Sequence, residues 1–253
     1  MTNELLFYQA YQDFYQMAEK SQAFSEYCKK AFGADFSQDG FSDVSQIDAI
    51  LQAARLDSGM AVLDIGCGNG KMLQYIHRVT DAEVYGFDYS EQAIAFARNH
   101  SDFPSHFSVG AIGEMNYPAD SFDLIVSMDT MYFAPDMAAF VRQIHSWLKP
   151  GGQFFCAYQE GDVMPKTENA HSTVLAQAFR QNGFDYTVEN WTRRVYSLLL
   201  KKREAALLFR PDFEAEGNLE WYDVILHQTD EALLPFAEFE QRNARYLYCM
   251  IKA

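Results

Sequence analysis

The chain has 253 residues, of which 49 % are hydrophobic and 15 % aromatic, so a disordered polypeptide is excluded. Its net charge of −15 repels phosphate backbones, and nucleic acid is therefore not expected as a partner. No run of about 18 apolar residues is present, and the first residues lack the basic and apolar regions of a signal peptide. Neither a membrane-spanning helix nor a secretory signal is expected.

Four cysteines lie far apart along the chain and form no C-x-x-C pair: Cys28, Cys67, Cys156 and Cys249. We expect separate reduced thiols, used for packing, in a cytoplasmic protein. The six histidines show no metal-ligand spacing, so no metal site is expected. The assembly state is left open, and a homodimer is one candidate.

The first part of the chain, residues 1–42, is expected to form an N-terminal helical cap. Within it, residues 4–31 have the pattern of one amphipathic helix, because Tyr11, Phe14 and Ala18 recur at helical spacing after Phe7. These rings either pack on the core or line a substrate pocket. Both alternatives fit an aromatic stripe of this kind.

A loop bracketed by Gly33 and Gly40 leads to a helix, capped by Ser42 or Asp43, that runs to Arg55. Beyond it, strand patterns alternate with helix patterns. Strands are expected at 60–65, 83–88, 105–109, 122–128, 152–159, 184–191 and 245–251. Helices are expected at 70–79, 90–100, 136–148 and 169–182, with an inserted helical cap at 192–243. This alternation predicts one α/β domain over 1–253, with a mostly parallel sheet between two helical layers.

The most informative stretch, residues 62–70, reads Val-Leu-Asp-Ile-Gly-Cys-Gly-Asn-Gly. Glycines allow a strand to turn sharply into a helix and allow backbone to pass close to a ligand. A dinucleotide site has the spacing G-x-G-x-x-G, but Lys71 stands where its third glycine belongs. The pattern from Asp64 through Gly66, Gly68 and Gly70 instead resembles motif I of class I S-adenosylmethionine (SAM) dependent methyltransferases.

Four further features support this resemblance. The strand Glu83–Asp88 ends in an acid that can accept hydrogen bonds from both ribose hydroxyls, although NAD sites share this feature. The others are an apolar strand at 121–128, a Lys-Pro-Gly-Gly turn at 149–152 and a final strand at 245–251. Together they are similar to the methyltransferase type 11 group. The resemblance implies a Rossmann-like sheet of seven strands with the last strand antiparallel.

The resemblance also implies which residues bind SAM. The acid at the end of the first strand and the glycine loop would shape the methionine pocket, and the acid at the end of the second strand would bind the ribose. The full set is Phe41, Asp64, Gly66, Cys67, Gly68, Asp88, Tyr89, Ala111, Ile112 and Ser127. Many relatives have an acid at the position of Ala111, so the adenine amino group needs another partner here, such as backbone or Glu114.

Catalytic candidates follow the fourth strand of the pattern. Asp129 could align an ammonium group or take a proton, and Tyr132 could hydrogen-bond the nucleophile, although both could be structural. No histidine stands nearby to act as a base.

We expect SAM-dependent methyl transfer to a small-molecule acceptor, driven mainly by proximity and desolvation. A non-catalytic SAM-binding or nucleoside-binding protein is the alternative, and a nicotinamide oxidoreductase fits the glycine spacing least well. We also expect the two helical caps to meet over the cofactor, with Tyr11, Phe14 or Tyr15 contributing to the acceptor pocket.

Overall fold

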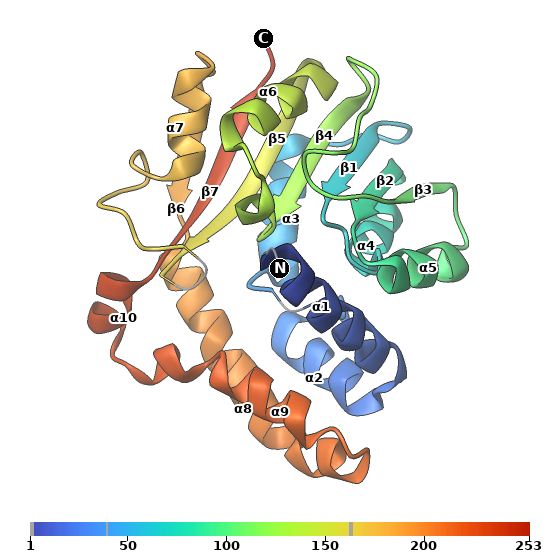
Figure 1. Ribbon diagram of the computed structural model, residues 1–253, viewed down its shortest axis with the longest axis vertical. Coiled ribbons are helices and arrows are strands. Elements are labelled where there is room, and N and C mark those ends of the chain that lie inside the picture. Colours follow the sequence, from blue (N-terminus) through green and yellow to red (C-terminus); the bar gives the residue numbers. More distant parts are fainter. Residues whose placement is uncertain (1–2, 39, 162–163) are drawn as a thin grey trace.

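The computed structural model describes residues 3–38, 40–161 and 164–253, with side chains from residue 8 onward. Seven strands form one sheet in the order β3-β2-β1-β4-β5-β7-β6 (Figure 1). The strands are β1 (Ala61–Ile65), β2 (Glu83–Asp88), β3 (Ser105–Val109), β4 (Phe122–Met128), β5 (Leu148–Glu160), β6 (Tyr186–Asn190) and β7 (Ala244–Ile251). β1 to β5 pair in parallel, whereas β7 is antiparallel to both β5 and β6. The predicted sheet is confirmed.

The helices α3 (Val44–Ala54), α4 (Lys71–Thr80) and α5 (Glu91–His100) cover one face of the sheet, and α6 (Met137–Trp147) and α7 (Val174–Gln181) cover the other. Each face has its own apolar cluster, with Leu73 and Ile94 in one and Val141 and Phe179 in the other. Both clusters include side chains of β1, all five of whose residues are buried. Because β1 pairs in parallel with both β2 and β4, the carboxyl ends of these three strands lie at one edge of the sheet.

A third apolar cluster lies beyond that edge. It is built by α1 (Asn3–Lys20), α2 (Gln22–Phe32), α8 (Thr192–Ala215) and α9 (Leu219–His227), which gather at one end of the molecule in Figure 1. Its buried aromatic side chains include Phe24, Tyr27 and Phe213. The chain then passes through the short turn η2 (Asp230–Leu233) and α10 (Phe236–Arg242) into β7. The N-terminal helices α1 and α2 thus share one core with α8 and α9, which lie far from them in the sequence.

Three element boundaries differ clearly from the predictions, the first being the start of β5 at Leu148 where 152 was predicted. The helix predicted over 4–31 breaks at Ser21, whose hydroxyl accepts a hydrogen bond from the Phe24 backbone N–H and starts α2. The helix predicted over 169–182 begins only at Val174, because the Thr173 hydroxyl accepts from the Ala176 N–H and caps it there. At Ser21 the capping hydroxyl outweighs an apolar pattern that continues across it, whereas at Thr173 the cap coincides with the start of the apolar residues.

In the parts of the chain that the structure describes, no helix is both long and apolar enough to cross a bilayer. The same residues contain no cluster of three or more His, Cys, Asp or Glu side chains that could hold a metal ion.

Candidate functional site

The glycine loop joins β1 to α4 at the carboxyl edge of the sheet. Gly66, Gly68 and Gly70 have φ values of +74°, +53° and +76°, a region that side chains rarely adopt. The loop is fixed to β2, because the backbone N–H groups of Gly66 and Cys67 both donate to the Phe87 carbonyl, at 2.9 and 3.0 Å. A Cβ on Gly66 would lie 2.5 Å from a Thr130 side-chain carbon, so the loop and the η1 turn (Met131–Phe133) approach closely.

Two buried carboxylates lie beside this loop. Asp88 accepts the Gly68 N–H at 3.0 Å and the Ser90 N–H at 2.8 Å, which fixes its orientation at the end of β2. Burial raises the pKa of Asp88 to about 6, although the two backbone hydrogen bonds oppose this. Burial, and secondly the charge of Asp88, raise the pKa of Asp64 to about 8. The site therefore favours a ligand that brings positive charge or hydroxyl donors.

Two adjoining cavities open at this edge. The larger, of about 400 Å³, is lined by Tyr8, Tyr11, Tyr15, Gly66, Phe87, Asp88, Tyr89, Gly110, Ala111, Ile112, Gly113, Glu114, Thr130, Phe133 and Pro135. The smaller, of about 90 Å³, is lined by Tyr11, Tyr15, Phe36, Ser37, Gln38, Gly40, Asp64, Gly66, Cys67, Gly68, Asn69, Met72, Met128, Asp129 and Thr130. Four residues line both cavities, so the two meet between α1 and the glycine loop: Tyr11, Tyr15, Gly66 and Thr130.

The helix α1 forms the outer wall of the larger cavity. The ring of Tyr89 lies 5.6 Å from that of Tyr8 and 6.0 Å from that of Tyr11, measured between centroids. Gln12 fastens α1 to α5, because its side-chain oxygen accepts from the Ser90 hydroxyl at 3.0 Å and from the Gln92 N–H at 3.2 Å. An aromatic helix thus covers the glycine loop.

The expectation that the two caps meet over the site is half right. Tyr11 and Tyr15 line both cavities, but Phe14 points into the cap cluster, where its ring contacts Phe24 and Trp221. No residue of 192–243 lines either cavity. Instead α8 packs along α2 and supports the N-terminal cap from behind, because the apolar face of α2 is directed away from the sheet.

Most residues that the resemblance assigned to the cofactor line the cavities: Asp64, Gly66, Cys67, Gly68, Asp88, Tyr89, Ala111 and Ile112. Ser127 does not. It is fully buried, its hydroxyl shares a hydrogen bond of 2.7 Å with Thr130, and the next residue, Met128, reaches the smaller cavity. Phe41 does not line either cavity, because its ring packs against α8 and lies 5.1 Å from the Lys202 ammonium.

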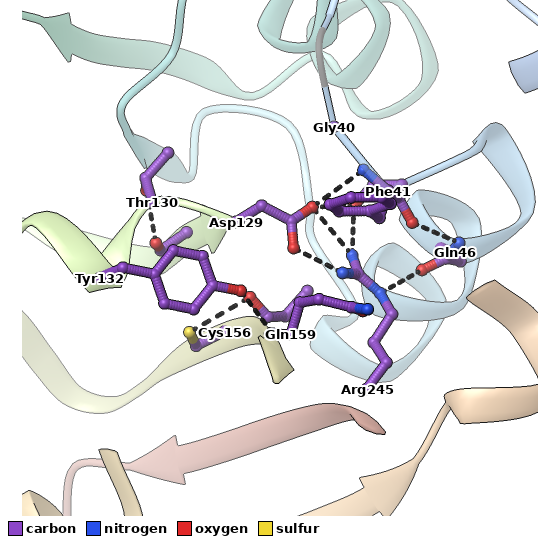
Figure 2. Close-up of polar contacts among 12 residues, drawn as sticks. Gly40, Phe41, Gln46, Asp129, Thr130, Tyr132, Cys156, Gln159 and Arg245 are labelled. Carbon is purple, nitrogen blue, oxygen red and sulfur yellow. Dashed lines mark hydrogen bonds and ion pairs between the residues drawn. The ribbon is translucent and has the colours of Figure 1, made fainter. Parts of the chain in front are cut away.

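The two catalytic candidates have different surroundings (Figure 2). Asp129 lines the smaller cavity but is paired with Arg245, whose side chain is fully buried. The Tyr132 ring packs on Tyr158, 4.9 Å between centroids, and its hydroxyl accepts from the backbone N–H of Gln159. Burial, and secondly the charge of Asp129, raise the pKa of Tyr132 well above its usual value. The catalytic roles of both residues stay predictions.

Several lining residues were missed by sequence reasoning, among them Ser37, Gln38 and Thr130. Arg245 was recognised only as part of the last strand. A signal for it existed. The start of a strand that is antiparallel to β5 lies at the carboxyl end of β5, at the edge of the sheet where Asp129 also lies, and Arg245 is the second residue of β7.

The glycine loop, the acid at the end of β2 and the strand order together define the class I SAM-dependent methyltransferases. Residues 56–203 match the family model described as a methyltransferase domain, which covers more than half of the chain. The chain therefore belongs to this family, and the resemblance stated from the motifs is confirmed. SAM is accordingly the cofactor that the site is built for.

Among curated proteins, the chain is 27 % identical over 230 residues to phosphoethanolamine N-methyltransferase 3 of Arabidopsis thaliana, covering 85 % of this chain and 46 % of that protein. It is 28 % identical over 174 residues to sterol 24-C-methyltransferase of Candida albicans, covering 66 % of this chain and 46 % of that protein. The chain thus spans less than half the length of these relatives.

Among solved structures, phosphoethanolamine N-methyltransferase 2 of Haemonchus contortus, in complex with phosphomonomethylethanolamine and S-adenosylhomocysteine, matches with a TM-score of 0.74. Its identity is 21 %, over 96 % of this chain and 60 % of that chain. The cyclopropane synthase MmaA2 of Mycobacterium tuberculosis matches with a TM-score of 0.68 at 18 % identity, over 96 % and 98 % of the two chains. These similarities show a common fold.

Proposed function

We propose that this protein transfers the methyl group of SAM to a small-molecule acceptor by in-line displacement. The observation that supports this most directly is the pair of adjoining cavities around the glycine loop. The larger cavity has the aromatic walls and the Asp88 carboxylate suited to an adenosine, and the smaller has the buried Asp64 suited to a cationic amino-acid end. SAM, when bound, supplies the activated methyl group.

The residues of the chain would act by binding, orientation and exclusion of water. Each oxygen of Asp88 already accepts one backbone N–H, and a carboxylate oxygen can accept a second donor, such as a ribose hydroxyl. Tyr8, Tyr11 and Tyr89 provide apolar surface over an adenine ring. With α1 over the site, the reacting atoms would be shielded from water, as a displacement at carbon requires.

The acceptor we propose is neutral or cationic. Among the described residues, neither cavity is lined by a Lys, Arg or His side chain. Basic groups near the cavities have partners of their own, since Lys71 pairs with Asp35 at 2.7 Å, Arg245 pairs with Asp129, and the Lys202 ammonium donates to the Gly40 carbonyl and to Gln228 at 3.3 Å each. The curated relatives include enzymes named for phosphoethanolamine and for a sterol. A phosphate would lack a cationic partner at these cavities, which favours an acceptor without one.

Calorimetry and an acceptor screen test the proposal. We expect SAM and S-adenosylhomocysteine to bind and NAD to show no heat, and we expect Asp88→Ala to weaken SAM binding by about 1.5–3 kcal/mol. Release of S-adenosylhomocysteine would then be measured with sterols, amines and phosphorylated amines. Turnover of the phosphorylated amines alone would contradict the acceptor class, and SAM binding without any turnover would favour the non-catalytic alternative.

We also propose a cytoplasmic location, which the four free cysteines support because oxidising compartments favour disulfides. A homodimer stays a prediction, to be tested by light scattering of the purified protein.

A further inference from the structure

We infer that Asp129 and Arg245 form a positioning unit for the cofactor site, and that Asp129 acts through this unit instead of accepting a proton. The unit holds Ser37, Gln38 and Gly40–Ser42, which we call the wall loop because its first three named residues line the smaller cavity. The inference deepens the proposed function and rests on it, since the cavity in question is the one proposed for the amino-acid end of SAM.

The ion pair is bidentate and buried. The Arg245 Nη1 lies 2.5 Å from Asp129 Oδ1, and its Nη2 lies 3.1 Å from Oδ2. The side chain of Arg245 has no exposed surface, and that of Asp129 is 9 % exposed. Paired groups of this kind keep a fixed geometry, because the planar guanidinium fits both carboxylate oxygens at once.

The same two side chains bind the wall loop directly (Figure 2). Asp129 Oδ2 accepts the backbone N–H of Phe41 at 3.1 Å and the Ser42 hydroxyl at 3.4 Å. Arg245 Nη2 donates to the Ser42 hydroxyl oxygen at 2.8 Å, and its Nε donates to the Gln46 side chain at 3.3 Å. Gln46 in turn donates to the Phe41 carbonyl at 3.0 Å. The loop is therefore held through both its backbone and its side chains.

The hydrogen bonds of Asp129 occupy most of its acceptor sites, with three donors at Oδ2 and one at Oδ1, and a proton taken up there would compete with its bonds to Arg245. A carboxylate offers about four lone-pair sites. Four donors surround it here, namely two guanidinium nitrogens of Arg245, the Phe41 N–H and the Ser42 hydroxyl. Arg245 cannot be deprotonated in a protein, so it cannot receive a proton that Asp129 takes up. The geometry is that of an anchor.

The local backbone agrees with this role. Asp129 has a φ of +64°, a left-handed conformation that persists only where the surroundings impose it. Gly40 lies next to this side chain, because a Cβ there would be in ordinary van der Waals contact with Asp129 Oδ2, at 3.6 Å. On the other side of the wall loop, the Lys71 ammonium lies 2.7 Å from Asp35 and 2.5 Å from the Ser37 hydroxyl. The loop is thus fastened near both of its ends.

Variants of the pair test the inference through SAM affinity and local hydrogen exchange. In D129N, R245M and the double variant, we expect SAM to bind about 10- to 100-fold more weakly by calorimetry. We also expect faster amide exchange in a peptide containing Phe41 and Ser42. The double variant should be no worse than the poorer single variant, because the two residues act as one unit. The double variant also leaves no unpaired buried charge, so we expect it to fold even if a single variant does not.

K252M is the matched control. Lys252 directly follows β7, and its ammonium pairs with Asp120 at 2.7 Å, but neither Lys252 nor Asp120 lines a cavity. It should leave SAM affinity and the exchange of the wall loop unchanged. Wild-type affinity and exchange in the double variant would overturn the inference, as would a D129N variant that loses turnover at saturating SAM while R245M keeps it. If the unmodified protein bound no SAM, the proposed function would fail, and the exchange measurement would still test the anchor.

Discussion

Asp64 shows how one buried side chain can make cofactor binding depend on pH. With a pKa of about 8, it is mostly protonated at pH 7 in the free protein. A cationic ligand in the smaller cavity would favour its ionised form, so binding would release a proton. The affinity for SAM should then rise with pH between about 6 and 8, by up to about tenfold per pH unit.

Calorimetry in buffers of different ionisation enthalpy checks this by counting released protons. We expect about one proton for the wild type at pH 7, and none from this group in Asp64→Asn. Because SAM titrates in the same way with both proteins, their difference isolates Asp64. Equal proton release from both would show that the ligand cation lies elsewhere.

Gly68→Ala should weaken SAM binding more than tenfold. The residue has a φ of +53°, and a Cβ there would clash with the Tyr15 hydroxyl, so both the loop and α1 would have to move. Gly59→Ala is the control, since Gly59 has a φ of +79° with open space around it. It should cost stability by about 1 kcal/mol through backbone strain while leaving the SAM dissociation constant unchanged. Equal effects of the two substitutions on SAM binding would contradict the close approach.

At the scale of elements, α1 is the least predictable part of the site. Its aromatic stripe was visible in the sequence, but the choice between core and pocket was open. In the structure α1 does both: Phe14 packs in the third apolar cluster, and Tyr11 lines the cavities. Periodicity defines which residues share a face, and only the partner elements decide what that face contacts.

Gln12→Ala should loosen α1 without unfolding the protein. The substitution removes the acceptor of the Ser90 and Gln92 hydrogen bonds that tie α1 to α5. We expect faster amide exchange in α1 and SAM binding weakened about three- to tenfold. Gln9→Ala, which removes only an exposed contact with Asp13 on the same helix, should change neither. Unaltered exchange in the Gln12 variant would mean that ring packing alone holds α1.

Apart from the start of β5, the strands and helices between residues 60 and 160 were predictable almost to the residue, because a buried parallel strand, a glycine turn and an amphipathic helix each leave a local signal. The helix starts after Ser21 and Thr173 were not predictable, since the sequence does not distinguish a serine or threonine that caps a helix from one inside it. Phe41 was assigned by its place beside a glycine in a loop, but the direction of a loop side chain depends on the element it packs against, here α8. Ser127 was assigned for its backbone carbonyl, and that role stays a prediction. The pairing of Asp129 with Arg245 spans 116 residues, and no local pattern encodes it.

For the whole molecule, the buried acids make the ligand-free protein less stable as pH rises. Asp64 and Asp88 have pKa values above those of an unfolded chain, so the native state binds more protons between about pH 4 and pH 8. Their contribution is complete below pH 4 and is lost as the pH passes about 6 for Asp88 and about 8 for Asp64. His145, whose pKa is lowered by burial, acts in the opposite direction near pH 6.

Urea unfolding from pH 5 to pH 8.5 checks this expectation. The free energy of unfolding should fall with pH in the wild type, and Asp64→Asn should be more stable than the wild type at pH 8 by on the order of 2 kcal/mol. Saturating SAM should reduce the difference, because it stabilises the ionised carboxylate. A wild-type stability that rises between pH 6 and pH 8 would refute the protonated state of Asp64.

The position of β7 in the sheet has a consequence for synthesis of the protein. This strand follows every other element along the chain, yet it lies between β5 and β6 and carries Arg245. A nascent chain that has left the ribosome only as far as α10 already contains the glycine loop and Asp88, but β6 has no partner strand and Asp129 faces no guanidinium. The edge of β5 is then open to other chains, which is a hazard in slow-folding sheets. If the Asp129–Arg245 pair positions the wall loop as inferred, the smaller cavity is completed only when β7 joins the sheet, and we expect tight SAM binding only after that step.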